Sequence, residues 1–575
     1  MSYKSPKDNS EHFKNVEEGV IHDYGTFDFI IVGAGSAGSV LTNRLSSISS
    51  WKILLLEAGD EGEVFVDIPA LYLYLSSSKY NWGYSVTSQK YGCKAAINSS
   101  CEYARGKILG GSSSINGLMY NRGHPKDYDY WKQLGNPGWG FEDVEPFFRK
   151  MENAQFPAKN LGHSGPLYIN YSTPVLPIQE TFRDAFAEMG IFETEYNGEN
   201  QIGTSRVESN IKHGWRVSGK NAYIKPALNR KNLNVTTKAF VTKVLIDNVT
   251  KIVRGVRFVR NGKTFDAFAK KEVILSAGAI NSPQILMLSG VGPESLLRKY
   301  DIPLIKNLPV GKKLLEHTVF AIAFSSNLTQ NKIPLSVQIE DFLKGEGLLT
   351  ASNNIKCLGY MNKDYLGRPE FEFSLLAPTG GNSYMNKTLT SLINDNIIER
   401  IKNMDSEKYF SIFVELLHAK SAGHVAIRSN DPKDFPEIDL NMLSAEEDME
   451  GMYKAVEILL DISKTEAFRK INASMYFPFT GCSNYERNSK KYWYCIIQNF
   501  SLPGNHAMGT TSMGYDPRTS VVNHELKVHG IGKLRVGDCG IIPATITGHT
   551  NGPAFMIGEK LSSMIKKEYM PKSNM

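Results

Sequence analysis

Residues 27–32 (FDFIIV), residues 33–38 (GAGSAG) and residues 39–47 (SVLTNRLSS) decide the fold of this chain. Apart from Asp28 the first run is apolar, as expected for a strand that is buried on both faces. In the third run, apolar residues recur at helical spacing, and a second apolar strand follows at Ile53–Leu56. The order strand, turn, helix and strand predicts a βαβ unit with a parallel sheet.

The glycines of GAGSAG match the G-x-G-x-x-G pattern of dinucleotide-binding turns. Gly33 permits a tight turn, Gly35 lets the backbone approach a pyrophosphate, and Gly38 lets helix and strand pack closely. Glu57 ends the second strand, near the spacing at which a carboxylate accepts hydrogen bonds from an adenosine ribose. The unit therefore predicts a bound dinucleotide, and it leaves NAD and FAD as alternatives.

Later motifs carry a more specific resemblance. They are Gly106–Gly123 (GKILGGSSSINGLMYNRG), Gly278–Gly292 (GAINSPQILMLSGVG), Leu308–His317, His506–Met513, Leu534–Pro543 and Thr550–Lys560. In this order, and spread over nearly the whole chain, they resemble the glucose–methanol–choline flavoenzymes, closest to insect members. One departure is Glu316, where that family usually has Asp.

The resemblance implies an α/β fold in two domains. The first is a Rossmann-type FAD-binding domain built from discontinuous segments, residues 25–160, 231–320 and 491–570. The second is an antiparallel-sheet-and-helix substrate domain of residues 321–490. Residues 161–230 are expected to be mixed, partly in the substrate domain.

The resemblance also implies the residues that contact FAD. Small residues and backbone N–H groups of the Gly110 loop suit a close approach to the cofactor. Where some members carry a His that bonds the flavin covalently, this chain has Ile115, so we expect non-covalent FAD. Asp538 either approaches the flavin ribityl and pyrophosphate or only caps a helix. The expected contacts are Gly33, Gly35, Ser36, Ala37, Gly38, Glu57, Ala58, Arg105, Gly110, Gly111, Ser112, Asn116, Gly117, Val241, Asp538, Asn551 and Pro553.

Alcohol oxidation needs a base for the hydroxyl proton, and a neutral imidazole serves near neutral pH. The resemblance assigns this role to His506, in NHAMGTTSMG, and makes Asn551 its partner at the substrate oxygen. Asn551 alternatively caps a helix that starts at Gly552-Pro553. His549 is the rival base, because it lies two residues from Asn551, and it departs from the many relatives that have Asn there. No His pair has metal-ligand spacing, so we expect no metal site.

These motifs predict an FAD-dependent enzyme that oxidises an alcohol to the aldehyde, by hydride transfer to flavin N5. Electrons then pass to oxygen or another acceptor. Aromatic residues in Phe371–Leu376 and Tyr476–Thr480 favour a small aromatic or terpenoid primary alcohol, although they can equally be core. The alternatives are a sugar (glucose-type) dehydrogenase and a non-redox FAD-containing hydroxynitrile lyase.

Composition and cysteine pattern bear on partners and compartment. A net charge of +6 over 575 residues, without concentrated basic runs, argues against a nucleic-acid partner, and no apolar run is long enough to span a bilayer.

The polar N-terminus lacks a signal sequence and favours the cytosol. A Cys93–Cys101 disulfide, as opposed to two free thiols, favours secretion with the signal peptide replaced. Eight glycosylation sequons also favour secretion: Asn98, Asn170, Asn234, Asn248, Asn327, Asn386, Asn472 and Asn499. The sequence does not indicate the oligomeric state, and a dimer is one alternative.

Overall fold

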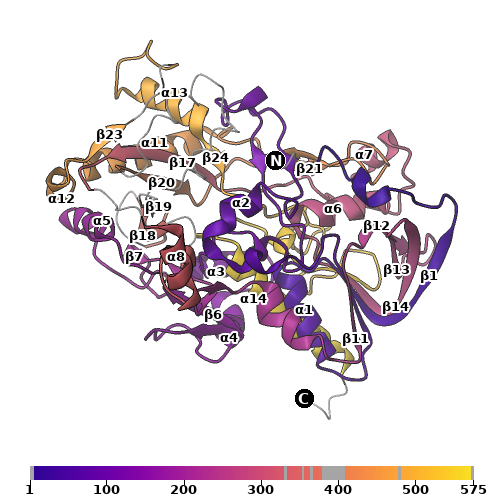
Figure 1. The fold of residues 1–575 in the computed structure, drawn as a ribbon. Coiled ribbons are helices and arrows are strands. Elements are labelled where there is room, and N and C mark those ends of the chain that lie inside the picture. Colours follow the sequence, from indigo (N-terminus) through magenta and orange to yellow (C-terminus); the bar gives the residue numbers. More distant parts are fainter. Residues whose placement is uncertain are drawn as a thin grey trace.

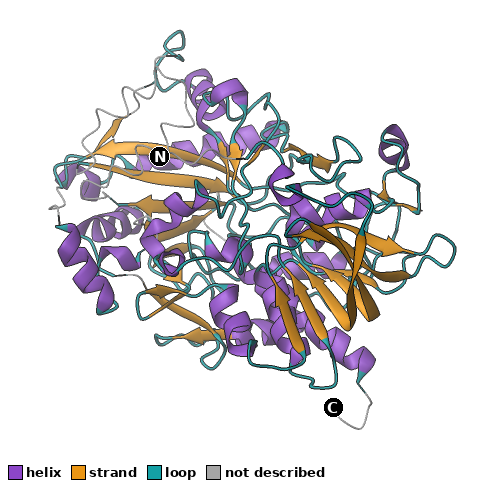
Figure 2. Ribbon diagram, turned by 45° about the vertical axis from the view of Figure 1, so that its right-hand side comes forward, coloured by secondary structure: helices purple, strands orange, loops and turns teal. Residues whose placement is uncertain are grey.

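Two seven-stranded sheets organise the protein in the computed structural model. The structure describes residues 6–171, 173–328, 333–351, 355–362, 367–377, 408–476, 479 and 481–570. The sheets occupy opposite sides of the molecule, with helices and loops between and around them (Figures 1 and 2).

The first sheet has the order β11-β2-β1-β14-β13-β12, and β25 pairs with β14. Strands β11, β2, β1, β14 and β25 run parallel, while β12 and β13 form an antiparallel extension. The strands are β1 (Ile21–Val32), β2 (Ile53–Leu56), β11 (Leu233–Thr236), β12 (Phe240–Ile246), β13 (Val253–Arg260), β14 (Lys263–Leu275) and β25 (Leu534–Val536). They come from three distant parts of the chain, which confirms the discontinuous Rossmann-type domain.

Helices cover this sheet because its central strands are buried on both faces, all four residues of β2 included. The helices of this domain are α1 (Ser36–Ser46), α3 (Pro125–Gln133), α4 (Phe141–Met151), α6 (Gly278–Leu288), α7 (Glu294–Lys299) and α14 (Asn551–Tyr569). A Cβ at Gly558 would lie 2.7 Å from the Ala37 carbonyl oxygen, so a glycine lets α14 pack closely on α1.

The second sheet is antiparallel, with the order β23-β17-β20-β19-β18-β7 and β24 paired with β17. Its strands are β7 (Gly203–Arg206), β17 (Thr318–Ser325), β18 (Ile355–Met361), β19 (Phe371–Leu376), β20 (Tyr409–Leu416), β23 (Ser474–Tyr476) and β24 (Leu502–Pro503). The helices around it are α5 (Pro177–Glu188), α11 (Glu446–Ile462), α12 (Glu466–Lys470) and α13 (Lys490–Phe500). The predicted sheet-and-helix domain is confirmed, although β24 comes from the segment assigned to the FAD domain. The residue ranges of the domains stay predictions.

Short elements connect the two sheets. The helices are α2 (Tyr72–Ser76) and α8 (Leu335–Leu343). The strands are β3 (Tyr84–Ser85), β4 (Glu102–Tyr103), β5 (Glu152–Ala154), β6 (Leu167–Tyr171), β8 (Glu208–Ser209), β9 (Ile211–Lys212), β10 (Trp215–Arg216), β15 (Val291–Gly292), β16 (Lys306–Asn307), β21 (His424–Ala426) and β22 (Glu437–Asp439). Among the described residues, no helix combines the length and apolarity needed to cross a bilayer.

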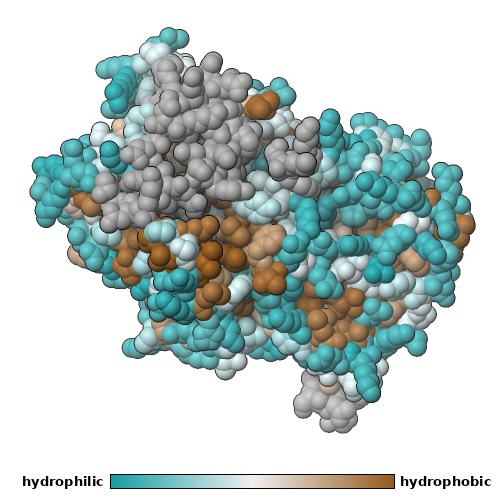
Figure 3. Space-filling model, viewed as in Figure 1, coloured by the Kyte–Doolittle hydropathy of each residue, from teal (hydrophilic) through white to brown (hydrophobic). Residues whose placement is uncertain are grey.

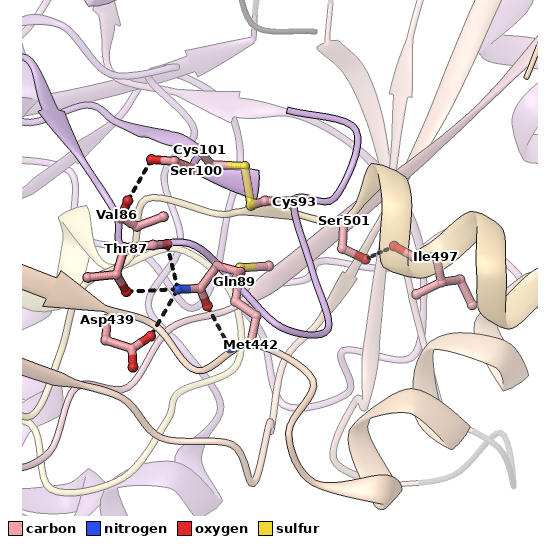
Figure 4. The surroundings of a disulfide bond; sticks show 10 residues. All are labelled: Val86, Thr87, Gln89, Cys93, Ser100, Cys101, Asp439, Met442, Ile497 and Ser501. Carbon is pink, nitrogen blue, oxygen red and sulfur yellow. Dashed lines mark hydrogen bonds between the residues drawn. A yellow bond between two sulfur atoms is a disulfide. The ribbon is translucent and has the colours of Figure 1, made fainter. Parts of the chain in front are cut away.

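Two disulfides stabilise the region around α13. The predicted bond between Cys93 and Cys101 is present, and Figure 4 shows it close to Ser501 at the end of α13. The Cys93 N–H donates to the Ser501 carbonyl at 3.0 Å, so this loop is anchored on the helix. A second bond, Cys482–Cys495, was not predicted, and its spacing gave no signal. Of the eight sequons, Asn386 lies outside the described residues.

Candidate active site

A cavity of about 750 Å³ is lined by residues of both sheets. Most of the expected cofactor contacts line it, together with His506. Three do not: Gly38, Gly110 and Pro553. Pro553 is buried inside α14, and the two glycines shape the turns described next, so the contacts of these three residues with FAD stay predictions.

The GAGSAG turn forms one wall of the cavity. Gly33 has φ +98°, and a Cβ there would lie 2.5 Å from the Ser276 carbonyl oxygen. A Cβ at Gly38 would lie 1.9 Å from the Gly33 carbonyl oxygen, so this glycine is needed for helix–strand packing. A Cβ at Gly35 would meet no atom within 4 Å. The open space over Gly35, at the start of α1, fits a pyrophosphate.

A second glycine loop meets the first. The Gly110 N–H donates to the Ala34 carbonyl at 2.9 Å, and a Cβ at Gly111 would lie 2.6 Å from the Gly35 Cα. Within the described part of the chain, the buried Ser276 hydroxyl beside this cradle has no protein partner. Two bare backbone loops with an unpartnered hydroxyl suit an elongated dinucleotide such as FAD.

Arg216 is a site residue that the sequence did not single out. Its buried Nη1 donates to the side-chain oxygen of Asn116 at 2.9 Å and to the Asn116 carbonyl at 2.8 Å. The Asn116 side-chain oxygen also accepts from the Leu118 N–H at 3.1 Å. The hydrogen bonds from Arg216 and from the Leu118 N–H fix the side-chain amide of Asn116 on the cavity wall, where the sequence predicts a contact with FAD.

The Glu57 carboxylate holds the backbone of the GAGSAG turn by hydrogen bonds. Its two carboxylate oxygens accept from the Ala34 N–H at 2.9 Å and the Gly59 N–H at 2.8 Å. Burial raises the pKa of Glu57 to about 7, although both N–H groups oppose this shift. Glu57 also lines the cavity, so its contact with a ribose stays a prediction alongside this structural role.

Asp538 takes one of the two roles that the sequence left open, the helix cap. It caps the short 3₁₀ helix Cys539–Ile541, because its side chain accepts from the Gly540 N–H at 2.8 Å. The other carboxylate oxygen accepts from the Gly278 N–H at 3.0 Å and the Ser282 hydroxyl at 2.6 Å. Asp538 lines the cavity as well, and its contact with FAD stays a prediction.

Ile115 leads to the first testable prediction. It is 4 % exposed, lines the cavity, and offers no nucleophile for a bond to the flavin. Acid precipitation of the holoprotein should therefore leave free yellow flavin in the supernatant. Flavin that stays with the precipitated protein would show that another side chain bonds it covalently.

The backbone at His506 is held by Glu316. His506 follows β24, which pairs with β17 directly after His317. The His506 N–H donates to both carboxylate oxygens of Glu316, at 2.8 and 2.9 Å, and the His317 N–H donates to one of them at 2.8 Å. Glu at this position thus fixes the loop that presents the predicted base.

A chain of hydrogen bonds runs through His506. Its Nδ1 lies 2.9 Å from Glu415 Oε1, and its Nε2 lies 3.0 Å from His549 Nδ1. His549 Nε2 in turn lies 3.0 Å from Glu372 Oε1. His317 adds a second imidazole to Glu415, with Nδ1 at 2.9 Å. The predicted base therefore stands in a mostly buried cluster of three imidazoles and two carboxylates.

Burial and the neighbouring carboxylates shift the pKa values of His506 and His549 in opposite directions. Burial lowers the pKa of His506, and the Glu415 carboxylate only partly offsets this. Burial would also lower the pKa of His549, but the carboxylates of Glu372 and Glu415 outweigh it and raise the pKa to about 9. At neutral pH, His506 is thus neutral and His549 is an imidazolium.

Asn551 has other partners than the expected ones. Its side-chain oxygen accepts from the Ser36 hydroxyl at 2.8 Å, and its nitrogen donates to Asn210 at 3.3 Å. The alternative role as helix cap is wrong, because Asn551 is the first residue of α14 and Thr550 takes the cap position without a side-chain bond. The bond to Ser36 ties α14 to the first turn of α1. The residue next to the predicted base is His549.

Two groups of three side chains lie close enough to hold a metal ion: His317, Glu415 and His506, and Glu372, Glu415 and His549. The expectation of no metal site is therefore neither supported nor contradicted. The sequence gave no sign of these groups, because their members come from β19, β20 and three separate loops. Glu372 and Glu415 do interrupt apolar strands, and that interruption is the signal that could have found them.

Comparisons with known proteins agree with this geometry. The GMC oxidoreductase family models match residues 27–319 and 419–558. Glucose dehydrogenase [FAD, quinone] of Drosophila pseudoobscura pseudoobscura is 34% identical over 95% of this chain and 88% of its own. Ecdysone oxidase of Bombyx mori is 32% identical over 96% of this chain and 84% of its own. The structure of pyridoxine 4-oxidase from Mesorbium loti aligns with a TM-score of 0.81 at 26% identity, over 94% of this chain and 99% of that one.

The family models together match more than half of the chain, and two insect relatives exceed 30% identity over nearly all of it. The cradle of glycine loops fits FAD, and a histidine stands at the cavity in the predicted catalytic motif. The chain therefore belongs to the GMC oxidoreductases, FAD-dependent enzymes that act on CH–OH groups.

Proposed function

We propose that this protein oxidises an apolar primary alcohol, aromatic or terpenoid, to the aldehyde. His506 is the base, and His549 replaces Asn551 as its partner at the substrate oxygen. The 3.0 Å contact between His506 Nε2 and His549 Nδ1 carries the proposal, because it sets an acceptor and a donor side by side at the cavity.

The carboxylates of Glu415 and Glu372 determine which ring nitrogen of each histidine is a donor and which is an acceptor. His506 Nδ1–H donates to Glu415, which leaves the lone pair on Nε2. His549 Nε2–H donates to Glu372, and the protonated ring then has a second donor at Nδ1. A substrate oxygen that displaces the direct contact between His506 and His549 and reaches both nitrogens gives its proton to His506 and accepts from the charged donor of His549 as negative charge develops. When bound, FAD supplies the hydride acceptor, and oxygen or another oxidant takes the electrons.

The cavity lining supports an apolar substrate over a sugar. A sugar site needs several polar side chains, whereas most of the side chains that the second sheet contributes to the cavity are apolar. Its polar members are Ser374, Tyr409, Ser411, Glu415 and Tyr476. The two aromatic stretches from which the sequence predicts an apolar substrate, residues 371–376 and 476–480, differ in where their side chains lie. Tyr476 lines the cavity, but Phe371 and Phe373 lie in the core. Residues 477, 478 and 480 lie outside the described residues.

Anaerobic flavin reduction tests the proposal. Benzyl alcohol and geraniol should bleach the flavin faster than glucose does, and either oxygen or a dye should restore the colour. Faster reduction by glucose would favour the sugar dehydrogenase. Cleavage of a cyanohydrin, with no bleaching by any alcohol, would favour the hydroxynitrile lyase, since the same base can deprotonate that substrate.

The compartment belongs to the proposal as well. The Cys93–Cys101 and Cys482–Cys495 disulfides need an oxidising environment, which supports secretion. Five sequon asparagines are exposed and so accessible to glycosylation: Asn98, Asn234, Asn248, Asn327 and Asn472.

A further inference from the structure

One face of the second sheet forms a long wall of the cavity. Successive side chains of a strand point to opposite faces, so every second residue reaches the same side. Strand β17 contributes Val319, Ala321 and Ala323 to the cavity, and β20 contributes Ser411, Phe413 and Glu415 among its lining residues. The wall begins at the carboxylate that holds His506 and continues away from it.

The strand register orders this wall into rows. Val319 pairs with Glu415, Ala321 with Phe413, and Ala323 with Ser411. On β19, Ser374 joins the second row and Leu376 the third. Glu415 and Tyr409 are six residues apart on β20, so the wall extends about 20 Å at a rise of about 3.4 Å per residue. That length exceeds what a small alcohol can fill.

The side chains on β17 leave room along this length. Ala321 and Ala323 are the smallest side chains that an L-residue can present, and both follow Val319 on the same face. At the far end, Tyr409 and Tyr476 both line the cavity, with ring centroids 5.0 Å apart. Of the polar groups, Ser374 already donates to Glu372 at 2.8 Å. The wall along Ala321 and Ala323 is therefore mainly apolar, with Ser411 as the polar residue of its third row, and it ends at two aromatic rings.

The outer side of the cavity is apolar too. Helix α2 contributes Tyr72 and Leu73 to the lining. Figure 3 shows apolar side chains gathered on the face of the molecule over α2 and α8. On α8, Leu335 and Leu343 are 64% and 73% exposed. Apolar surface of this kind favours contact with a lipophilic molecule.

We propose that the substrate is an elongated apolar alcohol, whose hydroxyl contacts both His506 and His549 and whose chain follows Ala321 and Ala323 toward Tyr409 and Tyr476. This inference rests on the proposed function and replaces the expected small alcohol with a longer one. Ala321 and Ala323 then determine specificity, because each marks how far along the wall a substrate can reach.

Substrates of increasing length test this assignment. In the wild-type protein, kcat/KM for anaerobic flavin reduction should rise from benzyl alcohol through geraniol to farnesol, because each added contact with an apolar wall can contribute about tenfold or more. Ala323→Phe should lower kcat/KM for farnesol by about tenfold or more and leave benzyl alcohol nearly unchanged. Ala321→Phe, one row nearer to the base, should lower it for geraniol as well.

Ala323→Ser is the matched control, since it keeps the volume and should retain farnesol. Flavin absorbance and melting temperature establish that each variant is folded and loaded. Equal kcat/KM values for the three alcohols in the wild type would overturn the inference, as would an equal loss for benzyl alcohol and farnesol in Ala323→Phe. Reduction by no alcohol at all would instead overturn the proposed function.

Discussion

Flavin reduction by substrate should slow by about 10²–10⁴-fold in His506→Ala, the typical loss when a general base is removed. The reason is local, since Nε2 of His506 is the nitrogen that Glu415 leaves without a proton. FAD content should stay normal, because the cradle is formed by backbone of the loops at Gly33 and Gly110. Anaerobic stopped-flow absorbance measures the rate, and the flavin spectrum measures the content.

His506→Asn controls for the buried carboxylate. Asparagine can still donate to Glu415 but accepts no proton at neutral pH, so the rate should fall as in the alanine variant while stability recovers. The assignment is wrong if His506→Ala retains near-normal rates while His549→Ala abolishes reduction. In that case His549 is the base.

The rate of flavin reduction should also fall as pH rises through about 9, where His549 loses its proton. The pKa of His549 is raised, so its charged donor is present below that pH and lost above it. Glu372→Gln removes the carboxylate that raises this pKa, and the fall should move toward the ordinary imidazole value of about 6.5. His549→Ala should cost about 10²–10³-fold, as for loss of a donor to a developing oxyanion. Rate profiles against pH measure all three.

His549→Asn serves as the control, because its amide keeps a neutral donor that does not titrate. Its rate should be lower than that of the wild type and flat through pH 9. A fall at the same pH in this variant would assign the titration to another group. The acid limb belongs to His506, whose lowered pKa keeps it neutral to below the ordinary imidazole range.

Much of the cofactor domain could be predicted, because its signals are local in the sequence. The run from residue 27 to 56 contains strand, turn, helix and strand within one stretch, and the structure has β1, α1 and β2 there. Gly33 and Gly38 are each required because a Cβ would clash with nearby backbone, and Gly35 leaves open space at the start of α1. The Cys93–Cys101 disulfide is local as well, because it closes a short loop.

The catalytic cluster could be predicted only in part, because it depends on strand register. Glu372 and Glu415 are partners across β19 and β20, and nothing in the sequence fixes that pairing. Asn551 and His549 are only two residues apart, and the start of α14 decides which of them faces His506. The sequence motif therefore indicates the loop before α14, whereas the backbone geometry places His549 in contact with His506.

The pairing of Glu372 with Glu415 also constrains how this enzyme can evolve. Two like charges directly opposite on neighbouring strands are destabilising, and a buried carboxylate that loses its partner costs several kcal/mol, about 3–5. A lineage that exchanges His549 for a neutral residue removes the positive charge beside Glu372, whose carboxylate then keeps only the neutral hydroxyls of Tyr360 and Ser374 as donors. The tolerated order of mutation is therefore Glu372 first, to a neutral amide, and His549 afterwards. Descendants with a neutral residue at position 549 should therefore also carry a neutral residue at position 372.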